Sequence, residues 1–191
     1  MKIYRKAIPL PLDEIPIEYG EQQIDMRLTE EMVRTLDEKY HFKESLGGGM
    51  WGMAFLTQDD KVLKLTTDES EVEAAKLIKD VRHGPFAKVY EIGSIPDYKN
   101  AHLVHYIVKE FVTPLTEDQA SFFYQVEESI NDNEEAETLR QSDPVLYESI
   151  YDYINDVANY GFADTNSVDN IGIDSNGNLV SFDARMSEFA L

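Results

Sequence analysis

The first half of the chain alternates short apolar stretches with turn-forming residues, which is the pattern of β-strands joined by short connections. We expect strands over 42–46, 53–57, 61–66, 89–95 and 103–112. Between the third and fourth of these, Ala74, Ile78 and Val81 have helical spacing and predict a helix over 69–82. A shorter helix that ends near residue 39 is expected before the first strand.

The second half of the chain has a different pattern. Apolar residues recur at helical spacing from 116 to 160, and two short apolar stretches follow at 171–173 and 179–182. The turn between these stretches, 174–178, contains Asn-Gly, which is a strong hairpin signal. The element order predicts an α+β fold. It consists of an antiparallel five-stranded sheet with one helix, followed by a mostly helical part with a short β-hairpin.

The composition indicates a folded chain with an unusual charge. Hydrophobic residues make up 42% of the 191 residues, which is enough for a core. The formal net charge of −20 arises from 37 acidic and 17 basic residues. Such a surface repels phosphate backbones and anionic lipid, so we expect neither a nucleic-acid nor a membrane partner. It suits a basic protein partner or mimicry of a nucleic acid's charge, although surface carboxylates also serve solubility alone.

Other features bear on compartment and metal binding. The chain has no cysteine, which excludes disulfides, thiolate nucleophiles and cysteine zinc sites. Pro9 and Pro11 interrupt the N-terminal segment before any long apolar run, and no stretch reaches transmembrane length. We therefore expect a cytoplasmic protein. His102 and His105 would point to opposite faces of a strand, which argues against a histidine metal site.

The first candidate site is a glycine-rich turn. Gly47, Gly49 and Gly52 match the pattern G-x-G-x-x-G. A dinucleotide-binding fold needs a helix directly after this turn, whereas here a strand is expected. A strand–glycine turn–strand hairpin lets backbone amides approach phosphate oxygens without obstruction by side chains. Glycines in such a turn can equally serve the backbone conformation alone.

The second candidate is a lysine in the middle of the third strand. Lys64 lies between Leu63 and Leu65, and it would either point to solvent or face a partner on the following helix. Glu71 falls on the same helical side as the apolar positions and would face the sheet, with Glu73 as the second choice. A Lys64–Glu71 pair would hold the lysine toward phosphates.

The third candidate lies near the C-terminus. Asn170 and Asp183 come at the ends of the two strands of the predicted hairpin, and they would be neighbours. Two oxygen ligands of this kind can hold Mg²⁺, which keeps several waters and bridges nucleotide phosphates. The plainer interpretation is that these are loop residues that bond to their own backbone.

Together these motifs resemble the protein-kinase-like superfamily. Residues 42–112 resemble its N-terminal lobe, in which Gly47, Gly49 and Gly52 would form the glycine loop. Lys64 matches the strand lysine of this family. Glu71 matches its helix glutamate. The segment 108–112 resembles the connection where the backbone of Glu110 and Val112 would meet the adenine of ATP.

The resemblance extends to residues 164–183. Asn170 and Asp183 match the metal-binding residues of the family, and Asp164 would be the catalytic base. The sequence stops at Leu191, without the activation segment and the later helices that bind peptide substrates in the family, and it also departs from the family at three places within these motifs. Asp164 precedes Asn170 by six residues, so the expected fifth position is Thr165, and Asp169 competes for the role. Asp183 is followed by Ala-Arg. Lys109 stands where an apolar residue is expected near the adenine.

The resemblance implies an N-terminal extension with a short helix (1–41), a kinase-like N-lobe (42–113) and a reduced kinase-like C-lobe (114–191), in one structural unit. Two functions fit these residues. One is an ATP- and Mg²⁺-binding, kinase-like protein or atypical phosphotransferase. The other is a non-catalytic acidic module that binds a basic protein partner, as an inhibitor, immunity factor or antitoxin does.

Overall fold

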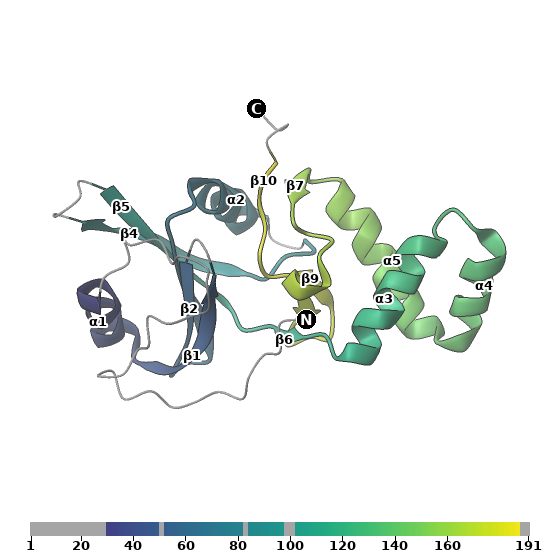
Figure 1. The fold of residues 1–191 in the computed structure, drawn as a ribbon, viewed down its shortest axis with the longest axis horizontal. Coiled ribbons are helices and arrows are strands. Elements are labelled where there is room, and N and C mark those ends of the chain that lie inside the picture. The colour runs from purple at the N-terminus through teal and green to yellow at the C-terminus, as the bar shows by residue number, and fades with distance from the viewer. Residues whose placement is uncertain (1–29, 50–51, 82–83, 98–101, 188–191) are drawn as a thin grey trace. The chain divides into compact units, whose positions relative to one another are not determined.

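The computed structural model describes residues 30–49, 52–81, 84–97 and 102–187 (Figure 1). Most of the expected N-terminal extension, residues 1–29, lies outside these ranges. The described chain forms two compact units. The first extends to Lys76 and also contains Lys88–Phe111, and the second contains Leu77–Ala87 and the chain from Val112 onward.

An antiparallel five-stranded sheet forms the first unit, as the sequence predicts. Its strands are β1 (Phe42–Gly49), β2 (Gly52–Thr57), β3 (Lys61–Thr66), β4 (Val89–Asp97) and β5 (His102–Glu110). Their order in the sheet is β1-β2-β3-β5-β4, and all neighbours are antiparallel. Helix α2 (Glu69–Asp80) follows β3 in the chain. Asp68 accepts hydrogen bonds at the start of this helix, including one from the Ser70 backbone N–H.

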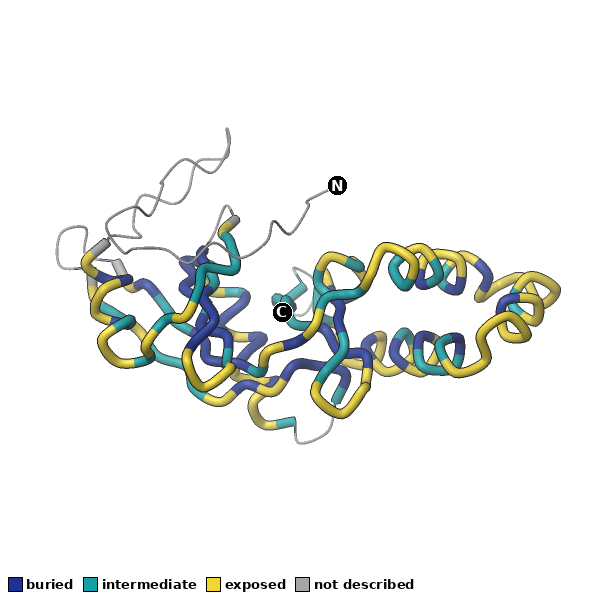
Figure 2. Tube along the Cα trace, turned by 90° about the horizontal axis from the view of Figure 1, so that it is seen from below, coloured by how far each residue is buried: buried dark blue, intermediate teal, exposed yellow. Residues whose placement is uncertain are grey.

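One face of the sheet forms the apolar core of the first unit. Because side chains alternate along a strand, Leu63 and Leu65 of β3 point to the same face, and both are fully buried. Helix α1 (Glu30–Tyr40) covers this face with Met32, Val33 and Leu36. The buried positions along the central strands are dark blue in Figure 2. Met32, Val33 and Leu36, which have helical spacing in the sequence, therefore form the face of α1 that contacts the sheet.

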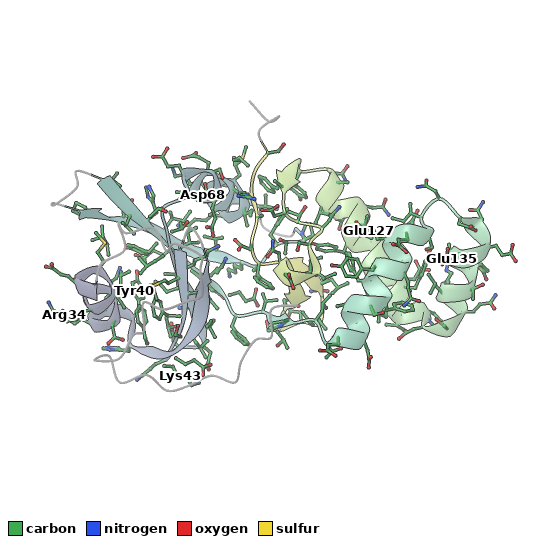
Figure 3. The ribbon with its side chains drawn as sticks, in the orientation of Figure 1. Arg34, Tyr40, Lys43, Asp68, Glu127 and Glu135 are labelled. Carbon is green, nitrogen blue, oxygen red and sulfur yellow. The ribbon has the colours of Figure 1, made fainter. Side chains whose placement is uncertain are left out.

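A cluster of polar and aromatic side chains fixes the end of α1 against the sheet. Lys39 Nζ donates hydrogen bonds to Tyr40 Oη (2.7 Å) and to Glu91 Oε1 (2.8 Å). The hydroxyl of Tyr106 donates to the same Glu91 oxygen, at 3.0 Å. A side chain at Gly93 would lie 2.3 Å from the Tyr106 ring, so the glycine makes room for that ring. Tyr40, labelled in Figure 3, also contacts the Tyr106 ring, with 5.8 Å between ring centroids.

The second unit contains the predicted helical region as three separate helices. They are α3 (Glu117–Ser129), α4 (Asn133–Ser142) and α5 (Pro144–Ala158). Side-chain caps divide them: Thr116 forms a capping box with Gln119, Asp132 caps α4, and Asp143 caps α5. No helix in the described part of the chain is long and apolar enough to cross a membrane.

Short strands complete the second unit. The predicted hairpin is present as β8 (Ile171–Ile173) and β9 (Leu179–Ser181), and β6 (Thr113–Pro114) pairs with β8. A second pair consists of β7 (Phe162–Ala163) and β10 (Arg185–Met186). In the hairpin turn, the Asp174 carboxylate accepts hydrogen bonds from the backbone N–H groups of Asn176 and Asn178. The turn chemistry seen in the sequence therefore fixes the register of the hairpin.

The cluster at the end of α1 predicts a pH dependence. The Lys39 hydrogen bond, and secondarily those from Tyr40 and Tyr106, lower the pKa of Glu91 against the opposing effect of burial. A lowered pKa in the folded state stabilises the fold above the unfolded-state value of about 4.3. This contribution is lost as the pH falls through the folded-state pKa.

We therefore expect Glu91→Gln to be less stable than the parent at pH 7 by less than about 1 kcal/mol, since the pair is partly exposed. The difference should shrink as the pH falls through the folded-state pKa of Glu91, which lies below its ordinary value. Urea denaturation at several pH values measures it, with the exposed Glu38→Gln on α1 as the control. A difference that persists unchanged at pH 3 would contradict the assigned role of the carboxylate.

Candidate functional site

The glycine-rich segment forms the hairpin between β1 and β2. Gly49 is paired with Gly52, and the residues after Gly52 form a strand, so a dinucleotide-type strand–turn–helix is absent at this position. At two of these positions, the backbone conformation or a close backbone contact requires glycine. Gly47 has a φ of +118°, and a Cβ at Gly52 would lie 2.0 Å from the Leu65 carbonyl oxygen. The hairpin has the predicted geometry, and its glycines also serve the sheet itself.

Lys64 lies in the middle of β3, on the face of the sheet opposite to Leu63 and Leu65. Its Nζ atom is 2.8 Å from Oε1 of Glu71, and the two side chains are only 17% and 7% exposed. The second choice, Glu73, instead pairs with Lys76 at the helix surface. The structure therefore brings together the lysine and the glutamate that the sequence suggested, and Lys64 does not point to solvent.

Burial of this ion pair has a desolvation cost that exposed ion pairs do not have. Removing two charges from water is expensive, and mutual attraction in the protein interior offsets this cost only when geometry is good. Lysine and glutamate are rarely buried for this reason. A buried pair therefore does little for stability, but it holds the ammonium group of Lys64 at a defined place on its face of the sheet.

In the second unit, the β8–β9 hairpin brings Asn170 and Asp183 together. Ile171 is opposite Ser181, and one step further the Phe182 N–H donates to the Asn170 carbonyl at 2.9 Å. Asp183 directly follows Phe182. Both candidate ligands therefore lie at the same end of the hairpin, as expected from the sequence, and both are half-buried.

The side chain of Asn170 has a defined orientation. Its Nδ2 donates to the Asp164 carbonyl oxygen at 3.1 Å. Because a carbonyl oxygen only accepts hydrogen bonds, this contact fixes which end of the amide is nitrogen. The Oδ1 atom, which is the metal-ligand atom of an asparagine, then points away from Asp164.

Asp164 begins the loop that leads to Asn170. It adopts a left-handed conformation with φ +64°, a region in which aspartate and asparagine are found more often than other residues except glycine. Arg185 Nε lies 2.5 Å from Asp164 Oδ2. The β7–β10 pairing explains this contact, because Arg185 is opposite Ala163, the residue before Asp164.

The contact of Arg185 with Asp164 was not predicted from the sequence. The sequence does show that Arg185 is the only basic residue after Arg140. An isolated cation in a strongly acidic stretch has many potential carboxylate partners, and only the strand pairing selects Asp164 among them.

Thr165 and Asp169 have different environments from Asp164. Thr165 is buried, and its carbonyl accepts a hydrogen bond from the Tyr153 hydroxyl. Burial raises the pKa of Tyr153, so this hydroxyl stays a donor. Asp169 is exposed within a short 3₁₀ turn, Val168–Asn170. The fifth position before Asn170 therefore faces the interior, and Asp164 holds its carboxylate at the surface of the loop.

The segment that resembles an adenine-binding connection crosses the boundary between the two units. Glu110 ends β5, and its N–H donates to the Lys88 carbonyl at 2.8 Å. Val112 begins the second unit and is buried there against Ala87 and Val180. The backbone of Glu110 is thus held by a hydrogen bond, and the side chain of Val112 is held by packing.

The oxygen atoms available to a metal ion are few. Among the described residues, no three histidine, cysteine, aspartate or glutamate side chains converge on one point. Asn170 and Asp183 offer one amide oxygen and one carboxylate. This set is too small for a metal held by protein alone, but it suits Mg²⁺, which takes its remaining ligands from water and phosphates.

No protein-family model matches the chain, and the search of curated proteins also found no match. The kinase-like interpretation therefore depends on the residues and local geometry described above.

The buried pair makes a sharp stability prediction. Lys64→Met leaves Glu71 as a buried charge without its counter-ion, and we expect a loss of about 3 kcal/mol. Glu71→Met should have a similar cost. The double variant should recover most of it, because removing both charges also removes the desolvation penalty. Urea denaturation of the four proteins measures this cycle.

The pair of Arg185 and Asp164 provides the matched comparison. Both side chains are more than 40% exposed. We expect the double-mutant cycle of Arg185→Met and Asp164→Asn to give a coupling free energy below about 1 kcal/mol.

Additive effects of the two substitutions in the Lys64–Glu71 cycle would show that the buried pair does not interact as described.

Proposed function

We propose that this protein is a kinase-like nucleotide-binding protein that takes ATP with Mg²⁺, and acts as an atypical phosphotransferase. The buried ion pair of Lys64 and Glu71 is the observation that carries the proposal. A buried pair contributes little net stability, so its presence is best explained by a requirement for an ammonium group at a fixed position. Binding to nucleotide phosphates is such a requirement.

In the first unit, Lys64 would contact phosphate oxygens and Glu71 would keep its side chain oriented. The glycine hairpin would place backbone N–H groups of the Gly47, Gly49 and Gly52 region against the phosphates. The backbone of Glu110 and Val112 would contact the adenine edge. These assignments follow the resemblance, and the Lys64–Glu71 geometry supports them.

In the second unit, Asn170 Oδ1 and the Asp183 carboxylate would hold Mg²⁺, which neutralises phosphate charge when it is bound. Asp164 would accept the proton of the phosphoryl acceptor. The hydrogen bond from Asn170 to the Asp164 carbonyl supports this grouping, because it joins the residue of the proposed base to a proposed metal ligand.

One observation favours a second candidate, the non-catalytic acidic module. Arg185 contacts the Asp164 carboxylate, so one of the two oxygens that would accept a proton already has a partner. In this candidate the protein binds nucleotide without transferring phosphate, or acts only through a basic protein partner. The net charge of −20 would then attract that partner.

Calorimetric titration of ATP, with and without Mg²⁺, tests the proposal. We expect metal-dependent binding by the parent and at least about tenfold weaker binding by Lys64→Ala, since a hydrogen bond to a charged group contributes about 1.5–3 kcal/mol. Asp183→Asn should lose most of the metal dependence. Lys43→Ala is the control, because Lys43 is an exposed lysine of the same unit.

Absence of binding at millimolar ATP would overturn the nucleotide-binding proposal and leave the acidic module. If ATP binds, measurement of ADP formation separates the two candidates. Turnover that Asp164→Asn abolishes supports the phosphotransferase. Binding without any turnover, in the parent and in Arg185→Met, supports the module.

A further inference from the structure

A buried tyrosine of α5 contacts the loop that contains Asp164, and the roles proposed above do not use it. Tyr153 is 3% exposed, and its ring packs against Phe123 of α3 with 6.0 Å between ring centroids. Its hydroxyl donates a hydrogen bond to the carbonyl oxygen of Thr165, the residue after Asp164, at 2.5 Å. Burial raises the pKa of Tyr153, so the hydroxyl stays protonated and remains a donor at neutral pH.

This hydrogen bond holds one of two successive peptide groups. The Asp164 carbonyl accepts from Asn170 Nδ2 at 3.1 Å, and the Thr165 carbonyl accepts from Tyr153. Because a carbonyl oxygen lies in the plane of its peptide group, the two bonds orient both peptide planes that follow the Asp164 Cα atom. Asp164 has a φ of +64°, and such a conformation persists only where the surrounding structure holds it. Tyr153 and Asn170 supply two of these restraints.

Different elements hold the two ends of Asp164. Arg185 contacts the carboxylate, and both of these side chains are more than 40% exposed, so this restraint is weak. Tyr153 acts on the backbone, where Thr165 is itself only 5% exposed. A buried acceptor that loses its donor has no water to replace it, which makes the bond from Tyr153 the firmer restraint.

The proposed metal ligand Asn170 depends less on this tyrosine. Its carbonyl accepts from the Phe182 N–H at 2.9 Å, and its own N–H donates to the Ser167 carbonyl at 2.8 Å. These backbone bonds join Asn170 to the end of the hairpin and to its own turn. Loss of the Tyr153 hydroxyl should therefore displace Asp164 more than Asn170.

We propose that Tyr153 is a positioning residue for Asp164. Its hydroxyl holds the Thr165 peptide group, and this keeps the Asp164 carboxylate where it would accept the proton of the phosphoryl acceptor. The inference rests on the proposed function. It predicts that the hydroxyl affects phosphoryl transfer and leaves nucleotide binding unchanged, because the reacting carboxylate must be placed precisely for the chemical step alone.

The test removes the hydroxyl and keeps the ring. In Tyr153→Phe we expect kcat for ADP formation to fall at least about tenfold, since a small misplacement of a reacting group lowers the rate steeply. KM for ATP, and the ATP affinity measured by calorimetry with Mg²⁺, should change by less than about twofold. The value of kcat is calculated per ATP site counted by calorimetry, so a smaller folded fraction cannot mimic the loss.

Tyr147→Phe is the matched control. Tyr147 is a second buried tyrosine of α5, 7% exposed, and its ring stacks on Tyr151. This variant should keep the kcat and KM of the parent. If Tyr153→Phe does not fold, Tyr153→His takes its place. Histidine keeps a ring N–H donor but is too short to hold the carbonyl at the same position, so the same split between kcat and KM is expected.

Parent-like kcat in Tyr153→Phe would overturn this inference and leave the proposed function intact. An equal fall of kcat in Tyr147→Phe would also overturn it, because the effect would then belong to α5 as a whole. So would a loss of ATP affinity as large as the loss of kcat. If the parent itself forms no ADP, the phosphotransferase and this inference fail together.

Discussion

Successive side chains of β3 point to opposite faces of the sheet, and this alternation determines how the rest of the first unit is arranged. Leu63 and Leu65 point into the core under α1, and Lys64 between them points to the other face. A shift of one residue in the pairing of this strand would bury the ammonium in the apolar core and move both leucines to the face that Glu71 approaches. The hydrophobic core therefore fixes the position of the lysine. Glu71, from the next element along the chain, then determines its orientation.

In the second unit, hydrogen bonds between short strands determine where the candidate site residues lie. The β8–β9 register brings Asn170 beside Phe182 and hence beside Asp183, and β7–β10 pairing brings Arg185 to Asp164. These strands have only two or three residues each, so little apolar burial holds them. The helices α3–α5 supply that burial through their own core, which includes Ile171 and Leu179 of the hairpin. The candidate ligands thus lie in loops that are anchored at both ends.

Much of this arrangement can be predicted from sequence, since periodicity and turn residues act locally. The five-stranded sheet, the helical region, the hairpin and the Lys64–Glu71 pair all follow from spacing. What could not be predicted depends on contacts between distant segments. The two-residue strands β7 and β10 have no periodicity to detect, so the contact of Arg185 with Asp164 is invisible in the sequence. The cluster of Lys39, Glu91 and Tyr106 likewise requires knowing that α1 packs on the sheet.

The charge distribution limits which ligand the proposed site at Lys64 could take. Residues 116–160 contain twelve acidic residues and one basic residue, and Glu127 and Glu135 on this stretch are labelled in Figure 3. A net charge of −20 opposes the approach of any polyanion at low salt. Buried charges interact strongly only at short range, where the dielectric is low. A nucleotide complexed with Mg²⁺ has less charge to repel at long range, and it still offers phosphate oxygens to ammonium groups at contact. Under the proposed function, the acidic surface and the buried Lys64 would both favour a metal-complexed nucleotide over a free polyphosphate.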